Sequence, residues 1–181
     1  MKNKSKLNKG FTVLESIVAI FILSLSIAGV FTAVQQSLSQ SIIAKDEVKA
    51  FYLAQEAVEV IRNLRDANQL VKIKNDLNHH WLNGIAQNSG DPCYFDHICR
   101  VDAVDFSLNY CGSSWDSCPA LKQNQSPFLY SYLSGQDTNF KREIQIESVS
   151  TNEITVTVWI TWSKGLVTRE FKAKTHLFNW I

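Results

Sequence analysis

Residues 11–34 read FTVLESIVAIFILSLSIAGVFTAV, an apolar run of 24 residues in which Glu15 is the single charged side chain. As a helix rising ~1.5 Å per residue, this run spans ~36 Å, enough to cross a bilayer core of ~30 Å. The sequence has no charged residue between Ser16 and Ala44, and no second run of this kind follows. We therefore expect one membrane segment at most, in the N-terminal part of the chain.

The ten residues before this run carry four lysines, at positions 2, 4, 6 and 9, and no acidic residue. Positive charge beside an apolar helix stays on the cytoplasmic side of the membrane, so we expect the rest of the chain to be exported. The whole chain has a formal net charge of +1, and loss of the four lysines lowers it to −3. This balance does not indicate a nucleic-acid partner.

The helical pattern continues beyond the apolar run. There is neither Gly nor Pro from Gln35 to Arg65, and apolar residues recur every three or four positions. This spacing predicts one continuous helix from about residue 11 to about residue 66, apolar all round in its first half and amphipathic in its second. The predicted apolar stripe of the second half consists of Val48, Phe51, Ala54, Val58, Ile61 and Leu64, widened by Tyr52, Leu53 and Ala57.

The C-terminal residues carry the period-two pattern of β-strands. Residues 153–163 alternate β-branched and aromatic residues, which predicts a half-buried strand with Ile154, Val156, Val158, Ile160 and Trp162 inward. Lys164-Gly165 is predicted to be a two-residue turn into a strand from Leu166 to Phe178, whose inward residues are Val167, Phe171, Ala173 and Leu177. A strand at 141–149, with Ile144 and Ile146 inward, precedes them. The sequence thus predicts an α+β fold, a long N-terminal helix packed on a C-terminal antiparallel β-meander.

The middle of the chain has weaker patterns. A short second helix is expected around Leu70–Ile85, and short strands at Cys99–Phe106 and Phe128–Leu133. An even, clustered set of cysteines in an exported segment predicts two disulfides, with three connectivities open. We expect any binding surface to lie on the loop 107–139, which carries aromatic side chains. The cysteines are Cys93, Cys99, Cys111 and Cys118, and the loop aromatics are Trp115, Phe128, Tyr130 and Tyr132.

Metal and catalytic sites are not favoured by the sequence. The cysteines lack the Cys-x-x-Cys spacing of a zinc site, although His79, His80 and His97 are near them. Five aspartates (91, 96, 102, 105 and 116) do not form a calcium-loop pattern. No nucleophile motif frames a Ser, His and Asp set. We therefore expect no metal, no cofactor and no enzymatic activity.

The motif Lys9-Gly10-Phe11-Thr12-Val13-Leu14-Glu15, followed by the apolar helix, resembles the prepilin signal of type IV pilins and type II secretion pseudopilins. The resemblance implies cleavage between Gly10 and Phe11 by a prepilin peptidase and methylation of the Phe11 amine. It also implies an ion pair between Glu15 and the N-terminal amine of a neighbouring subunit. These roles have physical reasons. Gly10 admits the backbone to a protease site without a side chain, and a carboxylate inside a membrane helix needs a partner.

Residues 53–63 resemble the soluble half of the first helix in PilV-type minor pilins and the related pseudopilins. Together with the prepilin signal, this resemblance implies a leader at 1–10, a transmembrane and assembly segment at 11–35, and an exported domain at 36–181. That domain contains the cysteine-rich region 91–139 and the meander 140–178. It further implies a minor pilin that passes from the inner membrane, with a cytoplasmic N-terminus, into an extracellular filament. The implied partners are other pilins, the peptidase, the membrane, and the assembly platform with its ATPase.

Other interpretations of the same residues stay open. A type II secretion pseudopilin shares every motif, and gene neighbourhood would separate the two. A secretory signal peptide cut after Ser26-Ile27-Ala28 would release the chain at Gly29, but Glu15 within the apolar core argues against it. A plain anchor, or a surface-anchored binding domain that never polymerises, would keep an uncut N-terminus and would not depend on Glu15.

Overall fold

The computed structural model describes residues 10, 12–74, 78–126 and 128–180, and the chain divides into two compact units, 1–46 and 47–181. Helix α1 (Val13–Lys74) begins in the first unit and ends in the second. In the first unit no described residue is buried. Within the described part of the chain, one helix, α1, is both long enough and apolar enough to cross a membrane. The α+β fold expected from the sequence is confirmed.

The helix is longer than predicted, and the predicted second helix is wrong. Leu70 still belongs to α1, and residues 81–90 form turns instead of a helix. Gly84 has a left-handed φ of 70°, which interrupts helical geometry there. The turns place Trp81 and Ile85 in the core, and the side chain of Asn68 donates to the carbonyls of Trp81 (3.2 Å) and Asn83 (2.9 Å). Hydrogen bonds and burial therefore hold this segment against α1 without helical structure.

The second half of α1 buries a stripe, but its centre differs from the predicted one. Val48 and Phe51 are about half exposed, whereas Ala50 and Ala57 are fully buried. Small side chains let the helix axis approach the sheet closely, so the alanine face packs inward and the larger residues lie at its border. Phe51 still makes an edge contact with Phe171, with 6.0 Å between ring centroids. The buried apolar residues of this stripe are Ala50, Leu53, Ala54, Ala57, Val60 and Ile61.

Three long strands form the predicted antiparallel meander: β5 (Gln136–Ser150), β6 (Glu153–Lys164) and β7 (Val167–Phe178). All five inward residues predicted on β6 are buried, as are Ile144 and Ile146 on β5. On β7, Val167 is exposed, but Leu177 is buried. The β6–β7 turn is shifted by one residue from the prediction, because Lys164 pairs with Val167 and Gly165, with a φ of 62°, is the first turn residue.

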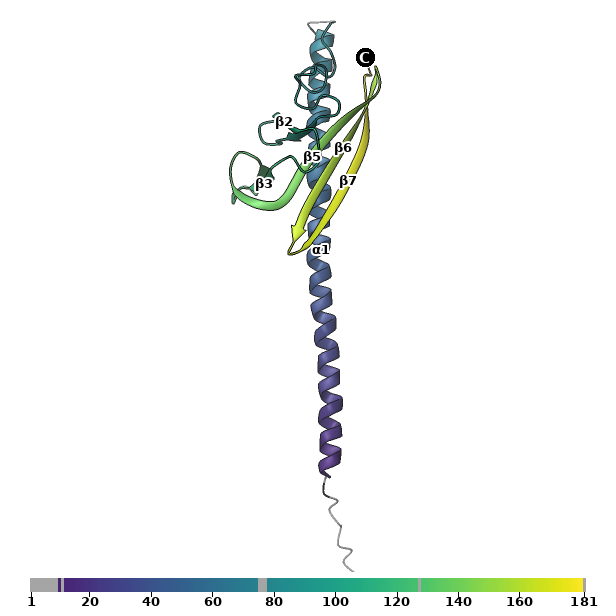
Figure 1. Cartoon of the computed structure of the whole chain (residues 1–181), viewed down its shortest axis with the longest axis vertical. Coiled ribbons are helices and arrows are strands. Elements are labelled where there is room, and N and C mark those ends of the chain that lie inside the picture. The colour runs from purple at the N-terminus through teal and green to yellow at the C-terminus, as the bar shows by residue number, and fades with distance from the viewer. Residues whose placement is uncertain (1–9, 11, 75–77, 127, 181) are drawn as a thin grey trace, which may run out of the picture. The chain divides into compact units, whose positions relative to one another are not determined.

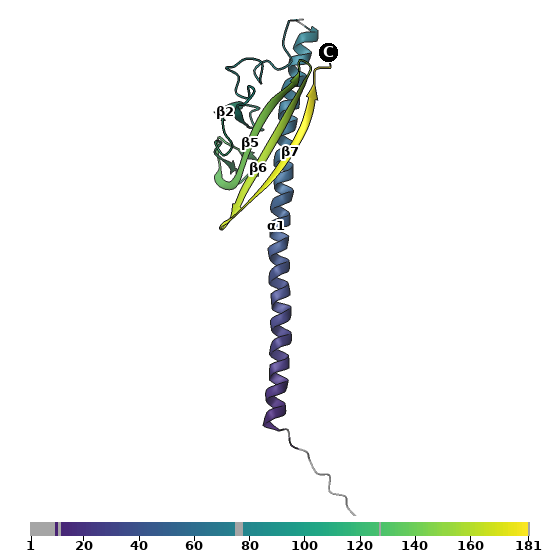
Figure 2. The ribbon, with the colours of Figure 1, turned by 45° about the vertical axis from the view of Figure 1, so that its right-hand side comes forward.

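Four short strands complete the sheet: β1 (Ile98–Val101), β2 (Leu108–Gly112), β3 (Ala120–Gln123) and β4 (Tyr130–Ser131). β1 and β3 both pair with the edge of β5 that does not contact β6. β2 then pairs with β1, and β4 with β3. In both views the long strands lie beside the part of α1 that belongs to this unit, and Figure 1 shows β2 and β3 on the side of β5 away from β6 (Figures 1 and 2).

The two strands predicted in the middle region are shorter than expected, and β2 and β3 were not predicted. β1 ends at Val101 because Asp102 is buried and turns the chain, its Oδ1 accepting from the Val104 N–H at 2.9 Å. The other oxygen of Asp102, Oδ2, accepts from the Ser131 hydroxyl and the Tyr132 N–H, both at 2.7 Å. This carboxylate thus links the end of β1 to β4 and limits both strands.

The four cysteines form two local disulfides, Cys93–Cys99 and Cys111–Cys118. The first lies in the core, where both cysteines are fully buried. The second closes the loop that follows β2. With all four sulfurs in disulfides, no cysteine thiolate is left to ligate zinc.

Candidate assembly and processing site

The first turn of α1 begins with a capping arrangement. The Thr12 hydroxyl oxygen accepts from the Glu15 N–H at 3.3 Å, and the Thr12 carbonyl accepts from the Ser16 N–H at 3.2 Å. Thr12 is therefore the N-cap, and Glu15 occupies the third helical position, the spacing of a capping box. No role was expected for Thr12, although the pattern Thr-x-x-Glu is a sequence signal of such a cap.

Glu15 lies in the first turn of the helix and is exposed. A carboxylate at this end is favoured by the partial positive charge of the unpaired backbone N–H groups. No ion pair of Glu15 occurs among the described residues of this chain. The helix start thus places one carboxylate at the end of an apolar surface, where a cation from another chain can reach it.

The residues that follow Glu15 form a helix surface suited to an apolar environment. Its large apolar side chains are about half to three quarters exposed all round the helix, for example Val13 at 78% and Phe31 at 63%. The polar hydroxyls among them are satisfied inside the helix, because Ser24, Ser26 and Thr32 each donate to the carbonyl four residues earlier, at 2.6–2.9 Å. A segment without free donors can lie in lipid or against other helices at little cost.

The processing residues are only partly within the described structure. Gly10 is exposed, and a Cβ placed on it would meet no atom within 4 Å. Phe11 and the leader lysines lie outside the described residues, so the expected cleavage and methylation at Phe11 stay predictions.

Comparison with known proteins agrees with these features. Residues 5–31 match the family model of the prokaryotic N-terminal methylation motif. No curated protein and no solved structure matches the chain. The chain therefore carries a type IV pilin-like prepilin signal in its N-terminal residues. Proteins of this type are structural and not enzymatic, and the apolar helix with this signal fits anchoring in a membrane.

Proposed function

We propose that this protein is a minor pilin of a type IV pilus, cut between Gly10 and Phe11, methylated at Phe11, and assembled through its N-terminal helix into an extracellular filament. The observation that carries the proposal is the match to the methylation motif at the start of a helix whose apolar surface has no cover within the described chain. In a membrane that surface contacts lipid, and in a filament it contacts the same segment of neighbouring subunits.

Glu15 has a specific role in this proposal. Cleavage removes the four lysines and leaves one new amine at Phe11, close in sequence to the capped helix start. A carboxylate of one subunit that pairs with the amine of the next fixes their axial offset. A charge that is buried between subunits without its partner is costly, because it loses its contact with water. Subunits that meet in the wrong register leave such unpaired charges and are therefore disfavoured. Residues 1–10 then act as the leader, 11–35 as the assembly segment and 36–181 as the exported domain.

The first experiment is intact-mass measurement and N-terminal sequencing of the protein from its native membrane fraction. The expected chain starts at methylated Phe11 and is lighter by four hydrogen atoms before reduction than after it, because both disulfides are formed. A chain that starts at Met1 in cells with an active prepilin peptidase contradicts the proposal and favours a plain anchor. A start at Gly29 indicates a secreted protein.

Assembly is tested separately with the substitution Glu15→Gln, which keeps size and polarity but removes the charge. We expect the amount of this subunit in sheared filaments to fall by about tenfold or more, from the loss of a charge-assisted hydrogen bond. Membrane insertion and cleavage should be unchanged. The control is Glu59→Gln, which removes an exposed carboxylate of the same helix that pairs with Arg62. If filaments are unaffected but secretion of an exported cargo fails, the protein is a pseudopilin.

A further inference from the structure

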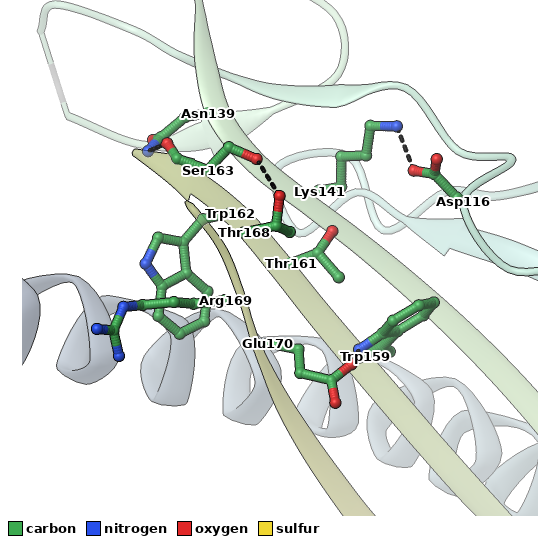
Figure 3. A pocket seen from close by; sticks show the side chains of 10 residues that line it. All are labelled: Asp116, Asn139, Lys141, Trp159, Thr161, Trp162, Ser163, Thr168, Arg169 and Glu170. Atoms are coloured by element: carbon green, nitrogen blue, oxygen red, sulfur yellow. Dashed lines mark hydrogen bonds and ion pairs between the residues drawn. The ribbon is translucent and has the colours of Figure 1, made fainter. Parts of the chain in front are cut away.

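The outer face of the meander, opposite α1, carries a groove of about 450 Å³. This volume is within the range of small-molecule sites, ~300–1,000 Å³. Its floor consists of cross-strand neighbours: Thr161 of β6 lies between Lys141 of β5 and Glu170 of β7, and Ser163 pairs with Thr168. Figure 3 shows these side chains along the groove, with Asp116 opposite Lys141, Ser163 beside Thr168 and Trp159 beside Glu170.

One wall of the groove is the loop closed by the Cys111–Cys118 disulfide, and it is held by a buried carboxylate. Glu143 is 1% exposed, and its two oxygens accept from the Asp116 N–H at 2.8 Å and the Cys118 N–H at 2.9 Å. Asp116 itself has a left-handed φ of 70°, a conformation that Asp and Asn adopt more readily than other residues with a side chain. A disulfide and a buried charge together hold one short loop over the sheet, an arrangement that indicates a preformed site.

The other wall is the indole of Trp159, which is fixed in place on several sides. Its Nε1 donates to the Glu170 carboxylate at 2.8 Å, and Lys172 Nζ lies 4.6 Å from its ring centroid. Trp115, from the disulfide loop, meets it edge-on with centroids 5.1 Å apart. Trp159 is therefore part of a rigid site. It does not belong to the hydrophobic core, whereas Trp162 does and is only 3% exposed.

The chemistry of the lining residues selects a neutral, hydroxyl-rich ligand. Each acid of the groove pairs with a lysine, Asp116 with Lys141 (2.5 Å) and Glu170 with Lys172 (3.8 Å), whereas Arg169 pairs with Glu47 of α1 (3.7 Å). The groove therefore has no excess charge to hold a phosphate or another anion. Carboxylates accept from hydroxyl groups, the ammonium donates to them, and Thr161 and Thr168 can do both. An indole wall suits the apolar C–H surface of a ring. We propose that this groove binds a saccharide, with Trp159 beside the sugar ring and Asp116 accepting from its hydroxyls.

The test uses the full chain in dodecylphosphocholine micelles, a detergent without a sugar headgroup. The five tryptophans give five indole N–H signals in a nitrogen-15 NMR spectrum, which single Trp→Phe variants assign. The probes are the methyl glycosides of glucose, galactose, mannose and N-acetylglucosamine, each titrated to about 50 mM because single-sugar sites often bind in the millimolar range. We expect saturable shifts of the Trp159 and Trp115 signals with at least one probe, and none of Trp180.

The variant Asp116→Asn separates binding from folding, since Asn also tolerates the left-handed conformation. It should weaken the apparent affinity by about tenfold, the effect of losing one hydrogen bond to a charged group. The matched control is Asp96→Asn, because Asp96 is also exposed and left-handed (φ 69°) but does not line the groove. Absence of a saturable shift with all four glycosides overturns the proposal, as does equal binding by Asp116→Asn and the unsubstituted chain. Binding of a protein chain in place of sugars also overturns it.

Discussion

Two buried charges at adjacent positions of β5 hold opposite faces of the sheet. Arg142 points toward α1, where its guanidinium donates to the Leu53 carbonyl (3.2 Å), the Glu56 carboxylate (2.6 Å) and the Val101 carbonyl (2.6 Å). Glu143 points the other way and holds the disulfide loop. Adjacent residues of a strand face opposite sides, so one dipeptide links the sheet both to the helix and to the outer loop.

At the residue scale, Glu143→Gln should lower the free energy of unfolding by about 2–3 kcal/mol. The amide keeps one acceptor oxygen but turns an NH₂ group toward the second backbone N–H, which leaves that donor buried and unpaired. The measurement is urea unfolding followed by tryptophan fluorescence. Glu147→Gln is the control: it lies on the same strand, its side chain is 49% exposed, and its partner is Lys174. Its effect should stay within ~1 kcal/mol, and equal losses in the two variants would contradict the role given to Glu143.

At the scale of elements, the periodic segments could be predicted from the sequence and the remainder could not. The alternation on β6 predicted its five inward residues, because a strand has only two faces, although Thr155 on the other face is buried as well. On α1 the apolar residues between 48 and 64 surround more than half of the helix, so their spacing did not decide which of them face the sheet. The face with Ala50 and Ala57 is the one buried against the sheet, because its small side chains allow the helix and the sheet to approach closely.

The two candidate sites differ in the same way. Gly10, Phe11 and Glu15 are close in sequence and form a local motif, so their proposed roles could be predicted from the order of residues alone. The groove combines residues of β5, β6, β7 and the disulfide loop, which only the strand registers bring together. The sequence indicated Trp115 through its loop position, but it could not indicate that Trp159 lies next to it.

The turn segment after α1 gives a pH prediction. Burial lowers the pKa of His80 below its ordinary value of 6.5, and the nearby Lys72 and His79 lower it further. Its Nδ1 also accepts from the Leu82 N–H at 3.1 Å, a bond that the protonated ring cannot accept. The unfolded chain therefore binds a proton at a higher pH than the folded chain. The stability contributed by neutral His80 is complete above pH 6.5 and is lost as the pH falls through the lowered pKa.

The measurement is the urea midpoint of unfolding between about pH 8 and pH 5, a range that brackets the ordinary histidine pKa. It is made on the unsubstituted chain and on His80→Asn. The amide oxygen of the introduced side chain can accept from the same N–H but does not titrate. The His80→Asn chain should lose less stability across this range. Because Lys72 and His79 face the same ring, His79→Asn is measured beside it. If His80→Asn follows the same pH dependence as the unsubstituted chain, another group is responsible.

At the scale of the whole molecule, folding and the proposed assembly use different parts of the chain. Every residue of the hydrophobic core cluster lies at Ala50 or later, and no described residue before Glu47 is buried. The N-terminal apolar segment thus contributes nothing to the core of the second unit, although it determines whether the protein needs lipid or detergent. Under the proposed function, selection on the two parts can proceed separately, since the segment 11–35 has to match other subunits and the outer face of the sheet does not.

A chain that begins at Glu47 should therefore fold without detergent. We expect both disulfides to form and the thermal midpoint to stay within about 5 °C of that of the full chain, because the new helix end loses only its first turn to fraying. The protein should be monomeric by sedimentation and should not enter filaments. A chain that begins at Ala57 is the control, since it lacks Ala50, Leu53 and Ala54 of the buried stripe and should not fold. If the Glu47 chain also fails to fold, the first 46 residues stabilise the second unit, and the separation of folding from assembly is wrong.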